Sequence, residues 1–300
     1  MAISFRARLM RRLLGRLIQD EKVPLPQRRI AMDRAGKLPK PRRVDYTETT
    51  VGGVAAIVAT PTAVEPDRHI LYLHGGGYIL GSPQSHIRLG ARLAKYAGAV
   101  VTLIEYRLAP EHVYPAAIDD CVAAYRDLAS RVDPALITIA GDSAGGGAAL
   151  ATMCVLRDAG DPLPACAYLL SPWTDLTGSG ESVTANDEID PMINGKLITA
   201  TAEMYAGDRP LDDPGISPLF ADLTGLPPLL IQTGTDEVLL SDSERLAERA
   251  AAAGVEHELD LQDGMWHVYQ AFVGFMPEAN AALVRAARFI RAQSPALVDA

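Results

Sequence analysis

Ser143 stands in Gly141-Asp142-Ser143-Ala144-Gly145, the only G-x-S-x-G pentapeptide of the chain. The pentapeptide follows the apolar run 136–140 and opens a small-residue stretch with helical character. A strand, a sharp turn and a helix expose a serine hydroxyl as a nucleophile, and the positive end of the helix dipole favours negative charge beside it. A glycine-rich structural turn is the alternative interpretation. The flanking pattern favours nucleophilic chemistry at Ser143.

A second glycine motif, His74-Gly75-Gly76-Gly77-Tyr78, directly follows the apolar run 70–73. Consecutive glycines weaken regular structure, so they are expected where the backbone geometry requires them. A flexible turn and a phosphate-binding loop are alternatives, but neither G-x-x-x-x-G-K-[ST] nor G-x-G-x-x-G occurs. An HGGG loop ahead of G-x-S-x-G supplies backbone N–H groups to an oxyanion. We expect those N–H groups to converge with that of Ala144, while His74 holds the loop.

A serine nucleophile needs a base, and two histidines follow Ser143 in the chain. His257 lies at the N-terminal end of the last expected strand, whereas His267 comes after that strand. Active groups of open α/β sheets gather beyond the carboxyl ends of the strands. The sequence therefore predicts His267 as the base, with activity rising through a histidine pKa near 6.5.

The base needs an orienting carboxylate, which we expect beyond the preceding strand, 229–233. Asp236 is the first acid after that strand and is predicted to take this role. Glu237 and Asp242 are the alternatives. Asp242 is expected to cap the helix that follows.

These motifs sit in a chain that alternates apolar strands with helical stretches. The expected strands are 43–51 and 53–60, joined as a hairpin at Gly52-Gly53, and then 70–73, 100–106, 136–140, 167–170, 229–233 and 258–261. The expected helices are 86–97, 115–131, 144–159, 241–253 and 276–293. Such alternation predicts an α/β fold whose mostly parallel sheet is covered by helices on both faces. The interval 177–225 has no strong strand, and its helical stretch 192–205 predicts an insertion over one end of the sheet.

The composition sets the remaining limits. With 48% hydrophobic and 22% charged residues in 300, the chain is expected to be globular, and its net charge of −9 argues against nucleic acid as the main partner. Cys121, Cys154 and Cys166 are far apart and no H-E-x-x-H occurs, so neither a disulfide framework nor a metal site is expected. We expect a cytoplasmic protein with reduced thiols.

The N-terminus is basic and repeats an apolar residue every fourth position, at Phe5, Leu9, Leu13 and Leu17, with Leu14 and Ile18 beside them. This spacing predicts a helix with one apolar face. We expect this face to pack on the body of the protein; a helix on a membrane surface or a transit helix is the alternative. No apolar run is long enough to span a bilayer, so stable membrane insertion is not expected.

From about residue 69 to the C-terminus, the chain resembles the bacterial hormone-sensitive lipase family of α/β-hydrolases. The resemblance rests on both glycine motifs and on further segments that match in place. Those segments are Tyr106–His112, Ser171-Pro172-Trp173, Leu226-Pro227-Pro228 and Gly264–His267. It implies an eight-stranded α/β-hydrolase sheet under a helical cap, with 1–42 and 177–225 in the cap and 43–176 and 226–300 in the core.

The resemblance also implies hydrolysis of carboxylic esters of short to medium acyl chain, without a cofactor, by an enzyme that is often a dimer through the sheet edge. By position, Ser143, Asp236 and His267 match the family's triad. Gly76, Gly77 and Ala144 match the oxyanion donors, with Gly75 shaping the loop. One departure is that the family often has Pro-Leu after the triad acid, where this chain has Glu237-Val238.

The same motifs are compatible with functions other than ester hydrolysis. The same triad serves amidases and lactonases, and the plant gibberellin receptor is a non-enzymatic protein of this fold that resembles the family. Six residues could line an acyl site or could equally form the core of the cap. They are Tyr78, Met192, Ile193, Leu197, Met204 and Tyr205.

Overall fold

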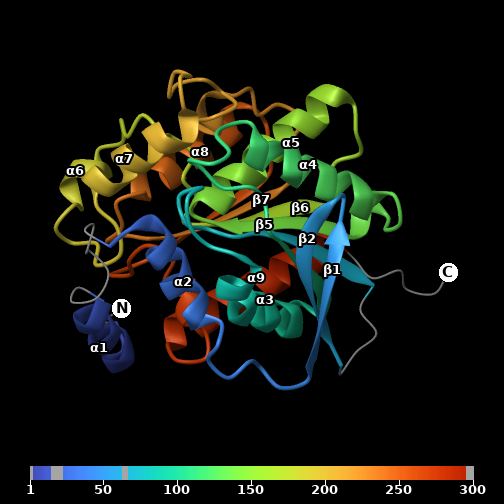
Figure 1. The fold of residues 1–300 in the computed structure, drawn as a ribbon, viewed down its shortest axis with the longest axis horizontal. Coiled ribbons are helices and arrows are strands. Elements are labelled where there is room, and N and C mark those ends of the chain that lie inside the picture. Colours follow the sequence, from blue (N-terminus) through green and yellow to red (C-terminus); the bar gives the residue numbers. More distant parts are fainter. Residues whose placement is uncertain (1–2, 15–22, 63–66, 295–300) are drawn as a thin grey trace.

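The computed structural model describes residues 3–14, 23–62 and 67–294 (Figure 1). In these ranges, eight strands form one sheet in the order β1-β2-β4-β3-β5-β6-β7-β8. The strands are β1 (Val44–Val51), β2 (Val54–Pro61), β3 (Arg68–Leu73), β4 (Ala99–Ile104), β5 (Ile137–Asp142), β6 (Cys166–Leu170), β7 (Leu229–Gly234) and β8 (His257–Gln262). β2 pairs antiparallel with β1 and β4, and all other neighbours pair in parallel. The predicted mostly parallel eight-stranded sheet is confirmed.

The hairpin at the sheet edge has the predicted turn. Val51 pairs with Val54, and Gly52 and Gly53 have φ values of 61° and 82°. A two-residue turn with both residues in the left-handed region matches the twist of the strands that it joins.

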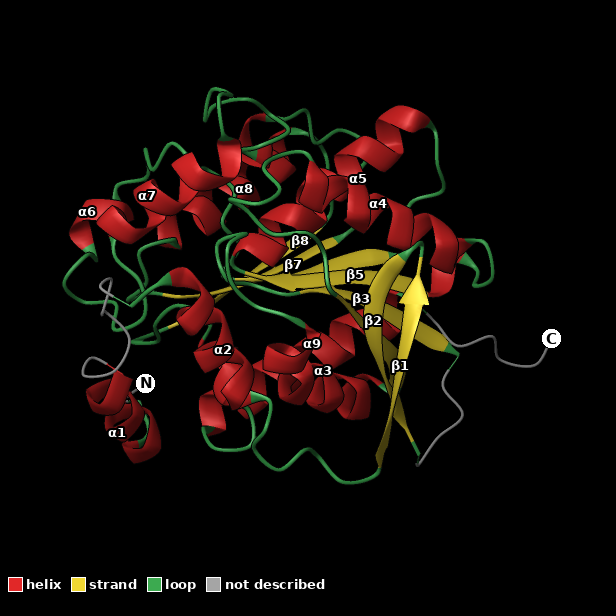
Figure 2. Ribbon diagram, in the orientation of Figure 1, coloured by secondary structure: helices red, strands yellow, loops and turns green. Residues whose placement is uncertain are grey.

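Helices cover both faces of the sheet (Figure 2). The helices of the body are α3 (Pro83–Ala97), α4 (Ala116–Ala129), α5 (Ala144–Ala159), α8 (Leu240–Ala252) and α9 (Pro277–Gln293). In β3, Leu71 and Leu73 belong to the core under α4, α5 and α8, whereas Ile70 and Tyr72 belong to the core under α3 and α9. Successive side chains of a strand point to opposite faces. A strand buried on both faces therefore has a continuous apolar sequence.

Short elements complete the body and the insertion. The chain between β6 and β7 contains α6 (Ser182–Ala185), α7 (Gly195–Ala206) and the 3₁₀-helix η2 (Pro218–Phe220); η1 (Pro134–Leu136) and η3 (Tyr269–Phe272) lie in the body. α6 and α7 lie together beyond one end of the sheet (Figure 1). Thr201 of α7 lies directly over Gly77, because a Cβ on that glycine would be 2.5 Å from Thr201 Cγ2. The insertion thus contacts the glycine loop.

Two helices precede the sheet, α1 (Phe5–Leu14) and α2 (Leu25–Ala35). α1 lies on the body, but only one residue of the predicted face within the described range, Leu14, is buried there. Ala7 and Leu14 are its buried residues, whereas Phe5, Leu9 and Leu13 are 72%, 41% and 44% exposed. Leu14 thus packs as predicted, whereas the ridge of Phe5, Leu9 and Leu13 does not. Leu17 and Ile18 lie outside the described residues.

No helix in the described part of the chain is both long enough and apolar enough to cross a membrane.

Candidate active site

Ser143 occupies the turn between β5 and α5, with φ 54° and ψ −123°. A non-glycine residue in this conformation is strained, and such strain persists only where the surroundings fix it. Here the Ser143 N–H donates to Leu170 O at 2.9 Å, and the Ser143 carbonyl accepts from the N–H groups of Gly146 and Trp173. A Cβ at Gly145 would lie 2.0 Å from Leu73 O. The second glycine of the motif therefore lets α5 approach the end of β3.

The glycine loop brings unpaired N–H groups to the same strand ends. Gly75 is the exception, because its N–H donates to Asp142 Oδ1 at 3.1 Å, and it shapes the loop. Within the described ranges, the N–H groups of Gly76, Gly77 and Ala144 make no hydrogen bond. Gly77 has φ 63° under Thr201, a place where no other residue fits. Three donors are thus free to bind an oxyanion.

Asp142 holds this loop from inside the core. Its carboxylate accepts from Tyr72 Oη at 2.7 Å and from Gly75 N, and it lies 3.3 Å from His86 Nε2. Burial alone would raise the pKa of Asp142 and lower that of His86. The electrostatic attraction between the two side chains outweighs the effect of burial. The pKa of Asp142 is therefore lowered and that of His86 is raised.

His74 is structural, as the sequence predicted. Its ring stacks on Tyr106 with centroids 4.2 Å apart, and its Nδ1 lies 3.0 Å from Gly75 O. Burial lowers the pKa of His74 to about 3, so the ring is neutral.

His267 lies between the nucleophile and a carboxylate. Its Nε2 is 2.9 Å from Ser143 Oγ, and its Nδ1 is 2.9 Å from Glu237 Oε2. An ionised carboxylate only accepts hydrogen bonds, so Nδ1 carries the proton and Nε2 is free to accept the serine proton. The side chain of Glu237 is fully buried and that of His267 nearly so.

The prediction that Asp236 orients His267 is wrong in this geometry. The Asp236 N–H donates to Met265 O, and the Asp236 carboxylate turns outward to Arg11 Nη1 at 2.6 Å. Glu237, weighed as an alternative, is one residue further along the chain. Its longer side chain folds back under the end of β7, where it reaches His267.

The Glu237 carboxylate is fully paired. Oε1 accepts from Ser171 Oγ at 3.0 Å, from Gly234 N at 2.5 Å and from Thr233 Oγ1. Hydrogen bonds from neutral donors make a buried charge tolerable.

The charge of the Glu237 carboxylate changes the pKa of His267. Burial alone would lower the pKa of His267, but the hydrogen bond and charge of Glu237 raise it, with smaller contributions from Asp190 and Asp142. The base therefore titrates above the 6.5 that the sequence predicted.

Two residues of the insertion, Asn186 and Asp190, make hydrogen bonds that hold the loop carrying Glu237. Asn186 Nδ2 donates to the carbonyls of Thr235 and Glu237, at 3.2 and 2.9 Å. Asp190 Oδ2 accepts from the N–H of Val238 at 3.1 Å, and Oδ1 accepts from that of Met192. Asp190 is buried, which raises its pKa to about 6.

Arg11 of α1 contacts the loop of Glu237 from the outer side, through Asp236. Its guanidinium contacts Asp236, Gly264 O at 3.4 Å and Ile189 O at 2.8 Å. One side chain thus links the acid loop, the loop before His267 and the insertion.

Sequence reasoning missed Asn186, Asp190 and Arg11, because no local pattern marks a long-range clamp. A signal for Glu237 did exist in the departure from the family's Pro-Leu at 237–238. With Glu237 as the acid, Leu239 takes the place of the family's leucine, and Val238 that of its proline.

Asp242, the other alternative acid, does not contact His267, and it does not cap α8. Its Oδ2 accepts from the N–H groups of Thr174 and Asp175, at 2.7 and 2.8 Å. The N-terminus of α8 has no side-chain cap. Asp242 is buried and its Oδ1 has no partner, and burial raises its pKa to about 7.

The six residues considered for an acyl site are mostly packed in the protein. Tyr78 and Tyr205 stack with centroids 3.7 Å apart, each 1% exposed, and Ile193 and Met204 pack against the same core. Met192 packs against the core on the other face, and Leu197 is half-buried. The structure therefore places Tyr78 and Tyr205 in the core.

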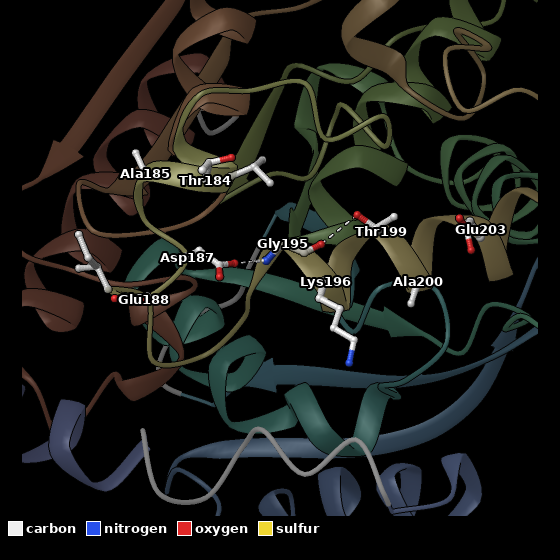
Figure 3. A pocket seen from close by; sticks show the side chains of 11 residues that line it. Thr184, Ala185, Asp187, Glu188, Gly195, Lys196, Thr199, Ala200 and Glu203 are labelled. Carbon is white, nitrogen blue, oxygen red and sulfur yellow. Dashed lines mark hydrogen bonds between the residues drawn. The ribbon is translucent and has the colours of Figure 1, made fainter.

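A hollow on the insertion is lined by other residues (Figure 3). It lies between α6, the following loop and α7, where Asp187 Oδ1 accepts from Gly195 N at 2.6 Å. None of the six residues above, and neither Ser143 nor His267, lines it.

Comparisons with known proteins show the family of the chain. A family model described as alpha/beta hydrolase fold matches residues 70–271. An acetyl-hydrolase of Streptomyces hygroscopicus is 43% identical over 269 residues, which are 88% of this chain and 89% of that protein. A crystal structure of an esterase from the bacterial hormone-sensitive lipase family has a TM-score of 0.94 and 39% identity, over 98% of this chain and 99% of that one. A crystal structure of EstE5 soaked with p-nitrophenyl butyrate has a TM-score of 0.93 and 39% identity, over 98% of this chain and 100% of that one.

The chain belongs to the bacterial hormone-sensitive lipase family of alpha/beta hydrolases. It is a carboxylesterase.

Proposed function

We propose that the chain cleaves carboxylic esters through an acyl-enzyme formed on Ser143. The observation that carries the proposal is the continuous hydrogen-bonded line from Ser143 Oγ through His267 to Glu237, with both contacts at 2.9 Å. A neutral imidazole between a hydroxyl and a carboxylate is the arrangement that activates serine.

In the first half-reaction, Ser143 Oγ attacks the ester carbonyl while His267 Nε2 takes its proton. The N–H groups of Gly76, Gly77 and Ala144 bind the oxyanion, and each such donor contributes about 3 kcal/mol to the stability of the transition state. His267 then protonates the leaving alcohol as the C–O bond breaks. Glu237 stays ionised and stabilises the imidazolium.

In the second half-reaction, His267 takes a proton from water, and the resulting hydroxide attacks the acyl carbonyl. The tetrahedral intermediate forms against the same three N–H groups. When it collapses, the proton returns to Ser143 Oγ and the carboxylic acid leaves. No step calls for a cofactor.

We propose esters of short to medium acyl chain as substrates. Support comes from the acetyl-hydrolase name of one relative and from the butyrate ester soaked into a similar esterase. A homodimer through the sheet edge remains a proposal. We also propose a cytoplasmic location, which the three buried cysteines, each without a disulfide bond, support.

The test is the burst of p-nitrophenol from p-nitrophenyl butyrate. The wild type is expected to show a burst, and mass spectrometry is expected to find the butyryl group on Ser143. Ser143→Ala should lose the burst and about a million-fold in kcat. An unchanged burst in this variant would refute the assignment. Rates on acetate, butyrate, octanoate and laurate esters test the acyl range.

A further inference from the structure

The charge of the chain is divided unevenly. Residues 1–43 hold 13 of its 28 Lys and Arg residues but only 3 of its 37 Asp and Glu residues. The first 43 residues thus carry a net charge of +10, and the other 257 carry −19. Such an asymmetry points to an interaction of the basic segment with an anionic partner.

The same segment exposes apolar side chains. Among the described residues, ten large hydrophobic side chains are exposed, and five of them lie before residue 44. These five are Phe5, Leu9, Leu13, Ile30 and Leu38. Exposed apolar residues that gather in one region mark an interaction surface more strongly than the same number scattered.

α1 combines both properties on its outer side. Phe5, Leu9 and Leu13 are four residues apart and form one exposed ridge along the helix. Arg8 and Arg12 are one residue before Leu9 and Leu13, and both are exposed. In the described part of the chain, neither arginine forms an ion pair. Figure 1 shows α1 at the border of the molecule.

Arg6 extends the surface toward α9. Its guanidinium lies 5.7 Å from the ring centre of Phe275, and its Nη1 donates to Phe275 O. Phe275 is itself 39% exposed. A cation and an aromatic ring therefore stand beside the end of the ridge.

We propose that this side of α1 docks on an anionic phospholipid surface. The ridge would enter the boundary between headgroups and acyl chains, with Arg8 and Arg12 at the phosphates. Nucleic acid fits less well, because a phosphate backbone would leave the ridge in water. A second copy fits less well too, because a two-fold interface would place the same arginines against each other.

The helix is also connected to the candidate active site. Arg11, on the inner side of α1, holds Asp236, the neighbour of Glu237. The enzyme would therefore bind the lipid surface in a fixed orientation. In that orientation, Arg11 links the docked helix to the loops that carry Glu237 and His267.

Co-sedimentation of the full chain with vesicles tests the proposal. We expect binding to phosphatidylcholine vesicles that contain phosphatidylglycerol, weak binding to pure phosphatidylcholine, and release by salt. Arg8→Glu with Arg12→Glu should weaken binding at least about 25-fold, since each basic residue near an anionic surface contributes roughly fivefold. Leu9→Glu with Leu13→Glu should weaken it at least about tenfold.

A matched control separates α1 from general surface hydrophobicity. Val155 and Leu261 are 41% and 44% exposed, as are Leu9 and Leu13, but they lie in the acidic remainder. Val155→Glu with Leu261→Glu should leave vesicle binding unchanged. All three double variants should hydrolyse a soluble ester as the wild type does, which shows that they are folded.

Four results would overturn the proposal. The first is no binding to phosphatidylglycerol vesicles at low salt. The second is binding that persists in both α1 variants. The third is stronger binding to DNA or RNA than to vesicles. The fourth is a change of mass in solution in Leu9→Glu with Leu13→Glu, without vesicle binding in the wild type, which would assign the ridge to a second copy.

Discussion

The nucleophile side and the acid side of the site are held in opposite ways. On the nucleophile side, the turn at Ser143 and the glycine loop are fixed from inside by Asp142, which binds Tyr72, Gly75 and His86. On the acid side, the loop of Glu237 is held from outside, by Asn186 and Asp190 of the insertion and by Arg11 of α1 through Asp236.

The difference predicts different responses to change. The contacts of Asp142 with Tyr72, Gly75 and His86 form an inner network that is buried in the core. Loss of this network should first reduce the stability of the whole fold. The outer clamp, formed by Asn186, Asp190 and Arg11, acts on the loop of Glu237. Its loss should change the titration and the rate of His267 more than the stability of the fold.

The acid side gives the largest expected effect. Glu237→Gln should reduce kcat by roughly 10³- to 10⁴-fold, because an amide cannot fix the required tautomer or stabilise the imidazolium. Asp236→Asn is the matched control and should lower kcat less than about tenfold, since Asp236 contacts Arg11 and not His267. Steady-state hydrolysis of p-nitrophenyl butyrate measures both. The reverse order of effects would restore Asp236 as the orienting acid.

The inner network is tested by His86→Gln. Removing the cation leaves Asp142 as a buried charge with one partner fewer, which should cost about 3 kcal/mol of unfolding free energy. Since the folded pKa of His86 is raised, the pair stabilises fully below the unfolded pKa of about 6.5 and is lost as pH rises through the folded pKa. Urea unfolding should therefore show a larger deficit at acidic than at alkaline pH. A deficit independent of pH would contradict the ion pair.

The outer clamp is tested by Asp190→Asn. The amide can accept from only one of the two N–H groups that Asp190 now holds, so the loop of Glu237 should shift and lower kcat about tenfold. Loss of the charge should also move the lower limb of the pH profile to lower pH, because Asp190 helps to raise the pKa of His267. Glu188→Gln, an exposed acid of the same segment, should change neither. If the pH–rate profile of Asp190→Asn did not shift, Asp190 would have no effect on the pKa of His267 and would serve only to hold the loop.

The smallest effect is expected at the base of the insertion, in Asp242→Asn. Burial raises the folded pKa of Asp242 to about 7, well above its unfolded value of 3.8. The native state thus binds more protons, and this carboxyl makes stability fall as pH rises between these two values. The amide removes this dependence, so the melting temperature of the variant relative to the wild type should increase from pH 5 to pH 8. A constant difference would show that Asp242 does not titrate in this range.

The elements with local sequence signals were predicted well. Short runs of β-forming residues predict every strand, and the G-x-S-x-G and HGGG motifs predict Ser143 and the glycine loop because their geometry depends on neighbouring residues. Asp236 was preferred to Glu237 because only order along the chain was available. The structure separates them by direction, since Asp236 pairs with Arg11, 225 residues away.

The exposed ridge of α1 failed as a prediction for a related reason. Periodicity shows that Phe5, Leu9 and Leu13 share a face, but it does not show what that face meets. Leu14, at the margin of the predicted face, does pack on the body together with Ala7, and only tertiary contact decides which apolar residues are covered.

The pKa of His267, measured by NMR of the labelled ring, tests the central assignment most directly. In the wild type we expect a midpoint above 6.5, because the Glu237 carboxylate outweighs burial. In Glu237→Gln the midpoint should fall below 6.5, and in Asp236→Asn it should stay near the wild-type value. A midpoint that falls in Asp236→Asn and stays in Glu237→Gln would contradict the account.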